Sequence, residues 1–430
     1  MRSAARIARD IETLSGPAFT LAPGVIRRHG YTEAYRGTVA YVRDELEALG
    51  FAVGADPIGT LVARNRPAGE PVFGLGSHCD SNRNGGRYDG TLGVVAALEV
   101  CRLDRELGLG LPLQVMSFFE EEGSAFGFGL LGSRVMTGRV TDAELCALRS
   151  VDDGRSFTEH AEAAGFAPAR WRESARALDT LTGWIELHIE QGRVLQDRGL
   201  RVGVVDAITG FAQADLTVRG RADHAGSTPM DQRLDPGPVA GACLVELERL
   251  AREPAAPAVA TVGEIEARPG QITAIPESVR LALDIRSVDA GTFRGVARDI
   301  VRFAERDAGP RGLTVDYRER QTVEPTTLAP DVVAALRAAA ARIGEPSTTL
   351  PSHALHDTAL LAAHVPSAMV FVPCRDGISH SPLESARPAD ATVGVEVMLD
   401  AVVALTAKIR RSADAPRRIP ADHRGEAQQA

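Results

Sequence analysis

The stretch VFGLGSHCDSNRNGGRYDG, residues 72–90, decides how the rest of the sequence is interpreted. It begins with a short apolar run, continues with His78 and Asp80 on either side of one residue, and ends in a glycine-rich loop that carries Asp89. The apolar run predicts a buried strand, and residues two apart on a strand point to the same side. We therefore expect an imidazole and two carboxylates to gather where this strand ends, which is where α/β sheets usually place their sites.

Helical patterns and short apolar runs alternate on both sides of this stretch. They lie at 38–49, 91–107, 113–119, 184–189, 331–343 and 368–372. Short buried runs separated by helices are typical of a sheet that is covered by helices on both faces. A charged, irregular stretch at 141–179 predicts a helical insertion. The sequence therefore predicts the α/β class.

The pattern changes near residue 210, where strands begin to alternate apolar and polar residues. The predicted elements follow the order β-α-β-β-α-β, at 214–219, 238–252, 258–266, 279–286, 289–308 and 313–318. That order is the split pattern of a ferredoxin-like module. We predict a discontinuous catalytic domain at 1–210 and 326–412, with an inserted domain at 211–325. Residues 413–430 have almost nothing to bury and are predicted to be a disordered tail.

Composition narrows the classes of function. A chain of 430 residues is expected to form two compact units. Its net charge of −9 and its lack of a basic cluster argue against nucleic acid as a partner. No apolar stretch approaches the ~20 residues that a membrane span needs, so no membrane partner is expected. The five cysteines are scattered, and the N-terminus lacks a secretion signal, which together predict a cytoplasmic protein.

Three further segments place histidines and carboxylates at or directly after predicted strands: FFEEEG at 118–123, ELHIE at 186–190 and GISHSP at 377–382. Adjacent carboxylates repel one another, and after an apolar strand that repulsion is tolerable mainly where cations neutralise them. Any one segment alone favours a structural histidine, but the four segments together favour a metal site. Mixed imidazole and carboxylate ligands suit zinc, manganese, cobalt or nickel, and a site for two ions needs a bridging carboxylate.

These segments, together with HAGSTPM at 224–230, resemble the amidase branch of the M20 metallopeptidase family. That branch contains N-carbamoyl-L-amino acid hydrolases, β-ureidopropionases and allantoate amidohydrolases. The resemblance runs from about residue 24 to residue 409, and the motifs occur in the same order as in the family. It implies an aminopeptidase-like catalytic domain with a mixed sheet, and an inserted ferredoxin-like domain that acts as a lid and forms a homodimer. It also implies two divalent metal ions per subunit and a small substrate with a carboxylate.

The resemblance also implies a ligand set for the two ions. One ion would be held by His78, Asp89 and His188, and the other by Asp89, Glu122 and His380. Asp89 would then bridge the two ions.

Three residues are implied to support the reaction itself. Asp80 would accept a hydrogen bond from His78 and fix its tautomer. Glu121 would take a proton from the attacking water and later deliver it to the departing nitrogen. His224 would stabilise the developing oxyanion, across the dimer in many family members.

A further group is implied to bind the substrate. Arg286 would grip its carboxylate with two parallel hydrogen bonds. The others are Gln191, Thr273, His353, His356 and Asp357.

Several of these positions depart from the family pattern. Ala125 stands where the family has an arginine, Thr273 where it has an asparagine, and His353 and Leu355 where it has glycines. The reaction type therefore carries over more safely than the substrate. The leading hypothesis is hydrolysis of the linear C–N bond of an N-carbamoyl or similar N-acyl amino acid. The alternatives are an allantoate-type ureide amidohydrolase, an aminoacylase and, more remotely, a non-catalytic ureide-binding regulator, for which Glu121 would have no use.

Overall fold

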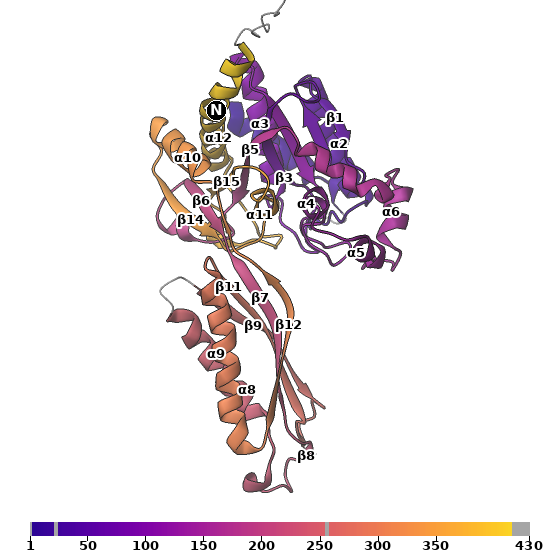
Figure 1. Cartoon of the computed structure of the whole chain (residues 1–430), viewed down its shortest axis with the longest axis vertical. Coiled ribbons are helices and arrows are strands. Elements are labelled where there is room, and N and C mark those ends of the chain that lie inside the picture. The colour runs from indigo at the N-terminus through magenta and orange to yellow at the C-terminus, as the bar shows by residue number, and fades with distance from the viewer. Residues whose placement is uncertain (1, 21–24, 254–257, 415–430) are drawn as a thin grey trace, which may run out of the picture.

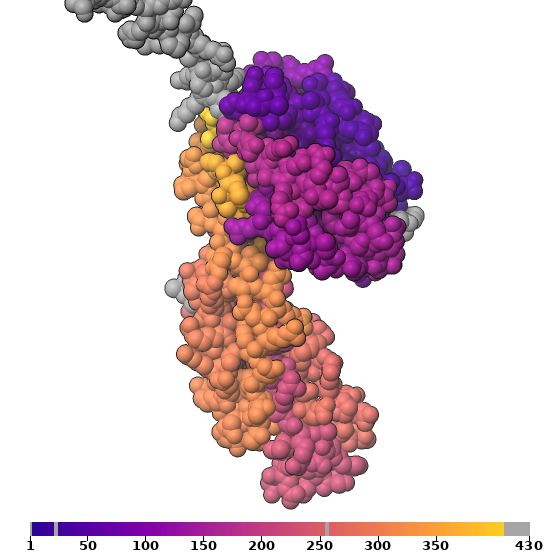
Figure 2. All heavy atoms as spheres, turned by 45° about the vertical axis from the view of Figure 1, so that its right-hand side comes forward, coloured from indigo at the N-terminus to yellow at the C-terminus, as the bar shows by residue number. Residues whose placement is uncertain are grey.

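The computed structural model describes residues 2–20, 25–253 and 258–414. The chain forms two modules joined end to end, each with its own sheet (Figure 1). We call residues 210–323 the second module and the rest of the described chain the main module. Figure 2 shows the second module as a lobe that extends away from the main module.

The main module is built on a nine-stranded mixed sheet with the order β1-β2-β4-β3-β5-β15-β6-β13, in which β14 also pairs with β6. Its central strands β4, β3, β5 and β15 run parallel to one another, whereas β1 and β2 are antiparallel additions at one edge. The strands are β1 (Ala52–Ala55), β2 (Leu61–Arg64), β3 (Val72–His78), β4 (Leu113–Phe118), β5 (Leu181–Ile189), β6 (Val202–Ile208), β13 (Thr326–Thr327), β14 (Ser347–Ser352) and β15 (Ser367–Val372).

Helices cover both faces of this sheet, as the sequence predicts. One face carries α1 (Arg2–Leu14), α2 (Glu33–Ala48), α3 (Thr91–Leu107), α10 (Pro330–Arg342) and α12 (Pro388–Asp414). The other carries α4 (Leu131–Met136), α11 (Asp357–Leu361) and a 3-10 segment at Pro168–Ala177. Alternate residues of β4 serve the two faces, because Val115 joins the larger core and Met116 joins the core around Trp184.

The remaining helices of the main module are short. The predicted helical insertion contains α5 (Asp142–Ala147) and α6 (Phe157–Ala163), and α7 (Val194–Asp197) follows β5. Five strands of the main module were not predicted from the sequence: β1, β2, β6, β13 and β14.

The second module has the predicted order of elements. It contains β7 (Gly210–Arg219), α8 (Gly237–Arg252), β9 (Ala258–Arg268), β11 (Ser278–Ser287), α9 (Ala290–Ala308) and β12 (Thr314–Val323). The strands form an antiparallel sheet in the order β12-β7-β11-β9, and α8 and α9 close a separate core around Leu216, Leu281 and Ile300. At the end far from the main module, β8 (Asp223–His224) pairs with β10 (Ala274–Ile275) (Figure 1). The exact domain boundaries, and the role of this module as a lid, stay predictions.

One expectation for the C-terminus needs correction. Helix α12 continues to Asp414, so the predicted disordered tail does not begin at residue 413. Residues 415–430 lie outside the described part of the chain. Within the described residues, no helix combines the length and the apolar character that crossing a membrane requires.

Candidate metal centre

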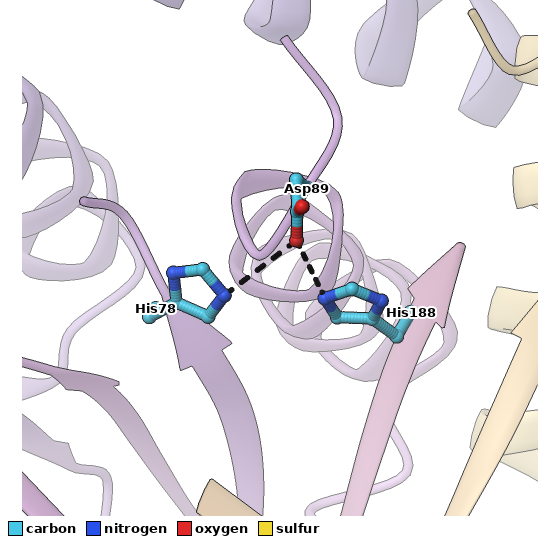
Figure 3. A group of neighbouring side chains, drawn as sticks. All are labelled: His78, Asp89 and His188. Atoms are coloured by element: carbon cyan, nitrogen blue, oxygen red, sulfur yellow. Dashed lines mark ion pairs between the residues drawn. The ribbon is translucent and has the colours of Figure 1, made fainter. Parts of the chain in front are cut away.

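Neighbouring strand ends bring two histidines to one carboxylate. His78 is the last residue of β3, and His188 lies one residue before the end of β5, which runs parallel beside β3. Asp89 lies just before α3, between the two imidazole rings (Figure 3). Its Oδ1 lies 3.1 Å from Nε2 of His188 and 3.8 Å from Nε2 of His78.

The second oxygen of Asp89 faces a different group. Its Oδ2 lies 3.1 Å from Nε2 of His380, and that nitrogen lies 3.5 Å from Oε1 of Glu122. Ligand atoms held about 2.1 Å from one tetrahedral ion lie about 3.4 Å apart, so both spacings fit shared coordination. In each of the two groups, all ligand atoms lie within 4.8 Å of one another. The two oxygens of Asp89 thus belong to two adjoining ligand groups.

A glycine makes this close approach possible. Gly90 has a φ of 60° and lies against the ring of His78, where a Cβ would come within 2.3 Å of Nε2. Any side chain there would displace either the imidazole or the loop that carries Asp89. A glycine at position 90 is therefore required both by the positive φ and by the close approach of the loop to the His78 ring.

Asp80 organises the opposite side of the cluster. Its carboxylate accepts hydrogen bonds from the backbone N–H groups of Glu121 (3.2 Å) and Glu122 (3.0 Å), and its Oδ1 lies 3.4 Å from Nδ1 of His78. Both Nε2 of His78 and Oε2 of Glu121 face the same space, 3.7 Å apart. Glu121 therefore lies beside the candidate ligands, where a base that acts on a water would have to be.

The cluster gathers several buried acids around its imidazoles. Burial raises the pKa of Glu121 well above its usual value, and burial together with the charge of Asp89 raises the pKa of Glu122 to about 7. The hydrogen bond with Asp89 raises the pKa of His380 to about 9. Burial thus disfavours the charged form of two acids in the cluster, and the neighbouring carboxylates favour the charged form of His380. Divalent metal ions would replace the protons of these groups, so the residues present fit the metals that the resemblance implies.

Two residues that position Asp89 were not predicted as site residues from the sequence. Oε1 of the buried Glu384 accepts hydrogen bonds from the backbone N–H groups of Tyr88 (2.7 Å) and Asp89 (3.0 Å). The hydroxyl of Ser379 lies 2.9 Å from Oε2 of Glu384 and 3.0 Å from Oδ2 of Asp89. Both residues lie beside His380 in the sequence, but spacing alone does not show which backbone groups they reach.

Glu120 was also left without a role, and the structure gives it one. Its carboxylate is fully buried and accepts hydrogen bonds from the backbone N–H groups of Gly30 and Ala125. Its own backbone has a φ of 54°, a conformation that non-glycine residues seldom adopt. The side chain thus stabilises the turn that sends Glu121 and Glu122 into the cluster.

Comparison with known proteins identifies the family to which the chain belongs. The model of peptidase family M20/M25/M40 matches residues 74–404 of the chain. The chain belongs to this family. The predicted membership is confirmed. The relatives within it are amidohydrolases, so the chain is a hydrolase of C–N bonds other than peptide bonds.

Individual relatives cover nearly the whole M20 chain. An N-carbamoyl-L-amino acid amidohydrolase of Geobacillus stearothermophilus is 37% identical, over 88% of this chain and 93% of its own. One from Paenarthrobacter aurescens is 36% identical over 94% of this chain and 98% of its own. A solved hydantoinase/carbamoylase family amidase from Burkholderia multivorans has a TM-score of 0.85 and 30% identity, and it covers 94% of this chain and 97% of its own.

The candidate ligands of the M20 chain line a cleft of about 320 Å³. Gln191 also lines it, and its Nε2 donates a hydrogen bond to Oδ2 of Asp89 (3.0 Å). His356 lines it as well, with its Nε2 2.8 Å from the hydroxyl of Ser352. The volume is at the small end of the range for ligand sites, which suits a small polar substrate.

Two other residues that were predicted to bind substrate lie farther from the cluster. His353 lines an adjoining cavity of about 450 Å³ that shares Gln191 and His380 with the cleft. Asp357 is fully buried and does not line the cleft, and its carboxyl accepts a hydrogen bond from the hydroxyl of Ser133.

Arg286 lines the cleft from the second module but is already partly engaged. Its Nε and Nη2 donate to the carboxylate of Asp284, and its Nη1 donates to the carbonyl oxygen of His353 (2.8 Å). A guanidinium has five N–H donors, so these three bonds leave two for a ligand. A substrate carboxylate would therefore share this arginine with Asp284.

The structure does not bring His224 and Thr273 to the cluster within one chain. Both are exposed at the β8–β10 end of the second module, which points away from the main module, and neither lines the cleft (Figures 1 and 2). Nδ1 of His224 accepts hydrogen bonds from the backbone N–H groups of Gly226 (3.0 Å) and Ser227 (3.1 Å). The neutral ring therefore carries its proton on Nε2, where it could donate to an oxyanion.

Proposed function

We propose that this chain is a di-metal amidohydrolase that cleaves the linear C–N bond of an N-carbamoyl amino acid or a similar N-acyl amino acid. The observation that carries the proposal is the position of Asp89, whose two oxygens face two different groups of candidate ligands. Relatives that cover most of this chain, at 36–37% identity, are N-carbamoyl-L-amino acid amidohydrolases, which favours a ureido substrate.

Two divalent ions would be held by the two groups, one by His78, Asp89 and His188 and the other by Asp89, Glu122 and His380. Zinc, manganese, cobalt and nickel all suit this donor set. When bound, such ions act as Lewis acids that lower the pKa of a coordinated water.

The chain's own residues would carry out the proton transfers and hold the substrate. Glu121 takes a proton from the attacking water and delivers it to the departing nitrogen, which its place beside His78 allows. The two unused donors of Arg286 hold the substrate carboxylate at the second-module wall of the cleft. The products would be the free amino acid, carbon dioxide and ammonia for a carbamoyl substrate.

We also propose a homodimer through the second module. His224 lies too far from the cleft of its own chain in this conformation, so a second copy is the simplest source of an oxyanion donor. The long strand β9 is an edge strand, and Val259 and Ile265 on it are 47% and 57% exposed. Edge strands of this kind are templates for pairing with another chain. The cytoplasmic location stays a prediction.

The test is a product assay with the purified, metal-loaded protein. Ammonia and free amine are measured with N-carbamoyl, N-acetyl and N-formyl derivatives of several L-amino acids. We expect the N-carbamoyl compounds to give the highest kcat/KM. Absence of turnover on every amide, with metal bound, would overturn the proposal and favour the non-catalytic regulator.

An allantoate-type activity is the second candidate, because the allantoate amidohydrolase of Bacillus subtilis is 30% identical over 88% of this chain. Thr273 and Leu355 differ from the family pattern, so the specificity of this pocket does not follow from the relatives. Allantoate in the same panel separates the two candidates. Turnover of allantoate well above that of every N-carbamoyl amino acid would favour the second.

A further inference from the structure

Arg134 is a second cation on the wall of the cleft, and neither the ligand set nor the proton transfers use it. It projects from α4 in the main module and lines the same cleft as His78, Asp89 and Arg286. Its Nε donates to the carbonyl oxygen of Gly129 (3.0 Å), and its guanidinium carbon lies 4.9 Å from the centre of the Phe128 ring.

Arg134 has no carboxylate in direct contact. Among the described residues no carboxylate forms an ion pair with it although it is half-buried, and the negative charge of Glu144 acts on it without a hydrogen bond. Only one of its five N–H donors is used, whereas Arg286 uses three and has Asp284 as a counterion. A buried cation without an anion is costly, and such a group in a cleft is a candidate for contact with a ligand.

The two arginines lie on different walls of one small cleft. Arg286 belongs to the second module and Arg134 to the main module, and the candidate metal ligands line the same space. The guanidinium of Arg134 also has its orientation fixed by Gly129 and Phe128, so little side-chain entropy is lost when it binds. An elongated substrate with an anionic group at each end matches this distribution of charge.

We propose that Arg134 is a specificity residue that binds a second anionic group of the substrate, which makes ureido acids with an acidic side chain the preferred class. The inference rests on the proposed function. The carboxylate next to the ureido group goes to Arg286 and the side-chain carboxylate goes to Arg134. A charge-assisted pair of hydrogen bonds in a partly desolvated cleft is expected to change kcat/KM by about 10- to 100-fold.

The test uses two substrates of nearly equal shape, N-carbamoyl-L-glutamate and N-carbamoyl-L-glutamine. We expect the wild type to prefer the glutamate compound at least tenfold in kcat/KM. In Arg134→Gln this preference falls to about one or reverses, while kcat/KM for the glutamine compound changes less than about threefold. Arg134→Lys keeps the charge but loses the planar fork, so it retains a reduced preference.

The matched control is Arg176→Gln, which removes an exposed arginine of the 3-10 segment that packs against α4 and does not line the cleft. Its glutamate preference should equal that of the wild type, and metal content and thermal midpoint are measured for all variants. An equal or lower kcat/KM of the wild type for the glutamate compound overturns the inference, whatever the fold of the variants. So does a preference that survives Arg134→Gln. Failure of both substrates and of every other amide would instead overturn the proposed function.

Discussion

The two parts of the proposed active site differ in how completely the fold assembles them. In the main module, His78, His188 and Asp89 are buried and their atoms already stand at ligand distances. In the second module, His224 and Thr273 are exposed at the far end of a separate lobe. One part of the site is prepared by folding, whereas the other needs another copy of the chain or a large movement.

The difference has a physical origin. Parallel strand ends in one sheet fix their side chains relative to one another, because the strands are hydrogen-bonded side by side and packed against a core on each face of the sheet. The second module has its own core, so its position is set by the two chain connections near residues 210 and 325 and by a few polar contacts such as the hydrogen bond from Arg286 to the carbonyl oxygen of His353. Metal ligands need a fixed geometry, and they lie in the main module. Groups that must move apart to admit substrate can lie in the second module.

Removal of the metal ions should have the largest effect, and it should act on one module only. With free metal at about 1,000 times its Kd, bound metal stabilises the folded state by about 4 kcal/mol, and a chelator removes that stabilisation together with all turnover. Hydrogen exchange should then accelerate in β3 and β5 but not in β7 or β11. Equal acceleration in both modules would contradict the separation of their cores, and re-added zinc serves as the control.

Replacement of Glu121 by glutamine tests the prepared part directly. We expect kcat to fall by about 10²- to 10⁴-fold because the base is lost, with both metal ions retained. The metal content by elemental analysis and the rate with the best substrate are the measurements. Glu162→Gln on the exposed face of α6 is the control and should behave as the wild type. Full activity in Glu121→Gln would remove it from the mechanism.

His224→Ala tests the distant part. We expect kcat to fall by about 10²- to 10³-fold through loss of an oxyanion donor, with metal content and thermal midpoint unchanged. Co-expression of His224→Ala with Glu121→Gln under two purification tags should give mixed dimers with roughly half of wild-type activity, because each purified mixed dimer then contains one intact site out of two. Each variant expressed alone is the control. No recovery in purified mixed dimers would show that His224 does not act across the dimer.

A core substitution in the second module should affect activity least. Ile300→Ala in α9 removes a fully buried side chain and should cost about 2–5 kcal/mol of the stability of that module. Titration with zinc, followed by calorimetry, should give unchanged metal affinity. A large loss of metal affinity in a folded sample would mean that the two modules do not fold as separately as their cores indicate.

The sequence predicted the parts of this molecule that depend on local periodicity. The apolar run that begins at residue 72 forms the predicted strand, and the helix at 91–107 has the predicted bounds, because apolar runs and helical spacing are properties of the chain itself. The family followed from motifs in order. The role of Glu384 could not be predicted, because its partners are backbone N–H groups almost 300 residues away, which only the folded chain places. The separation of His224 from the cluster of its own chain was implied only by the family resemblance, because it depends on how the two modules are joined and not on local periodicity.

The most direct measurement is anomalous X-ray scattering at the zinc edge from crystals of the zinc-loaded protein. The account predicts two peaks, about 3.5–4 Å apart, with one oxygen of Asp89 directed to each. A single peak, or two peaks of which one lies out of reach of Asp89, would contradict it.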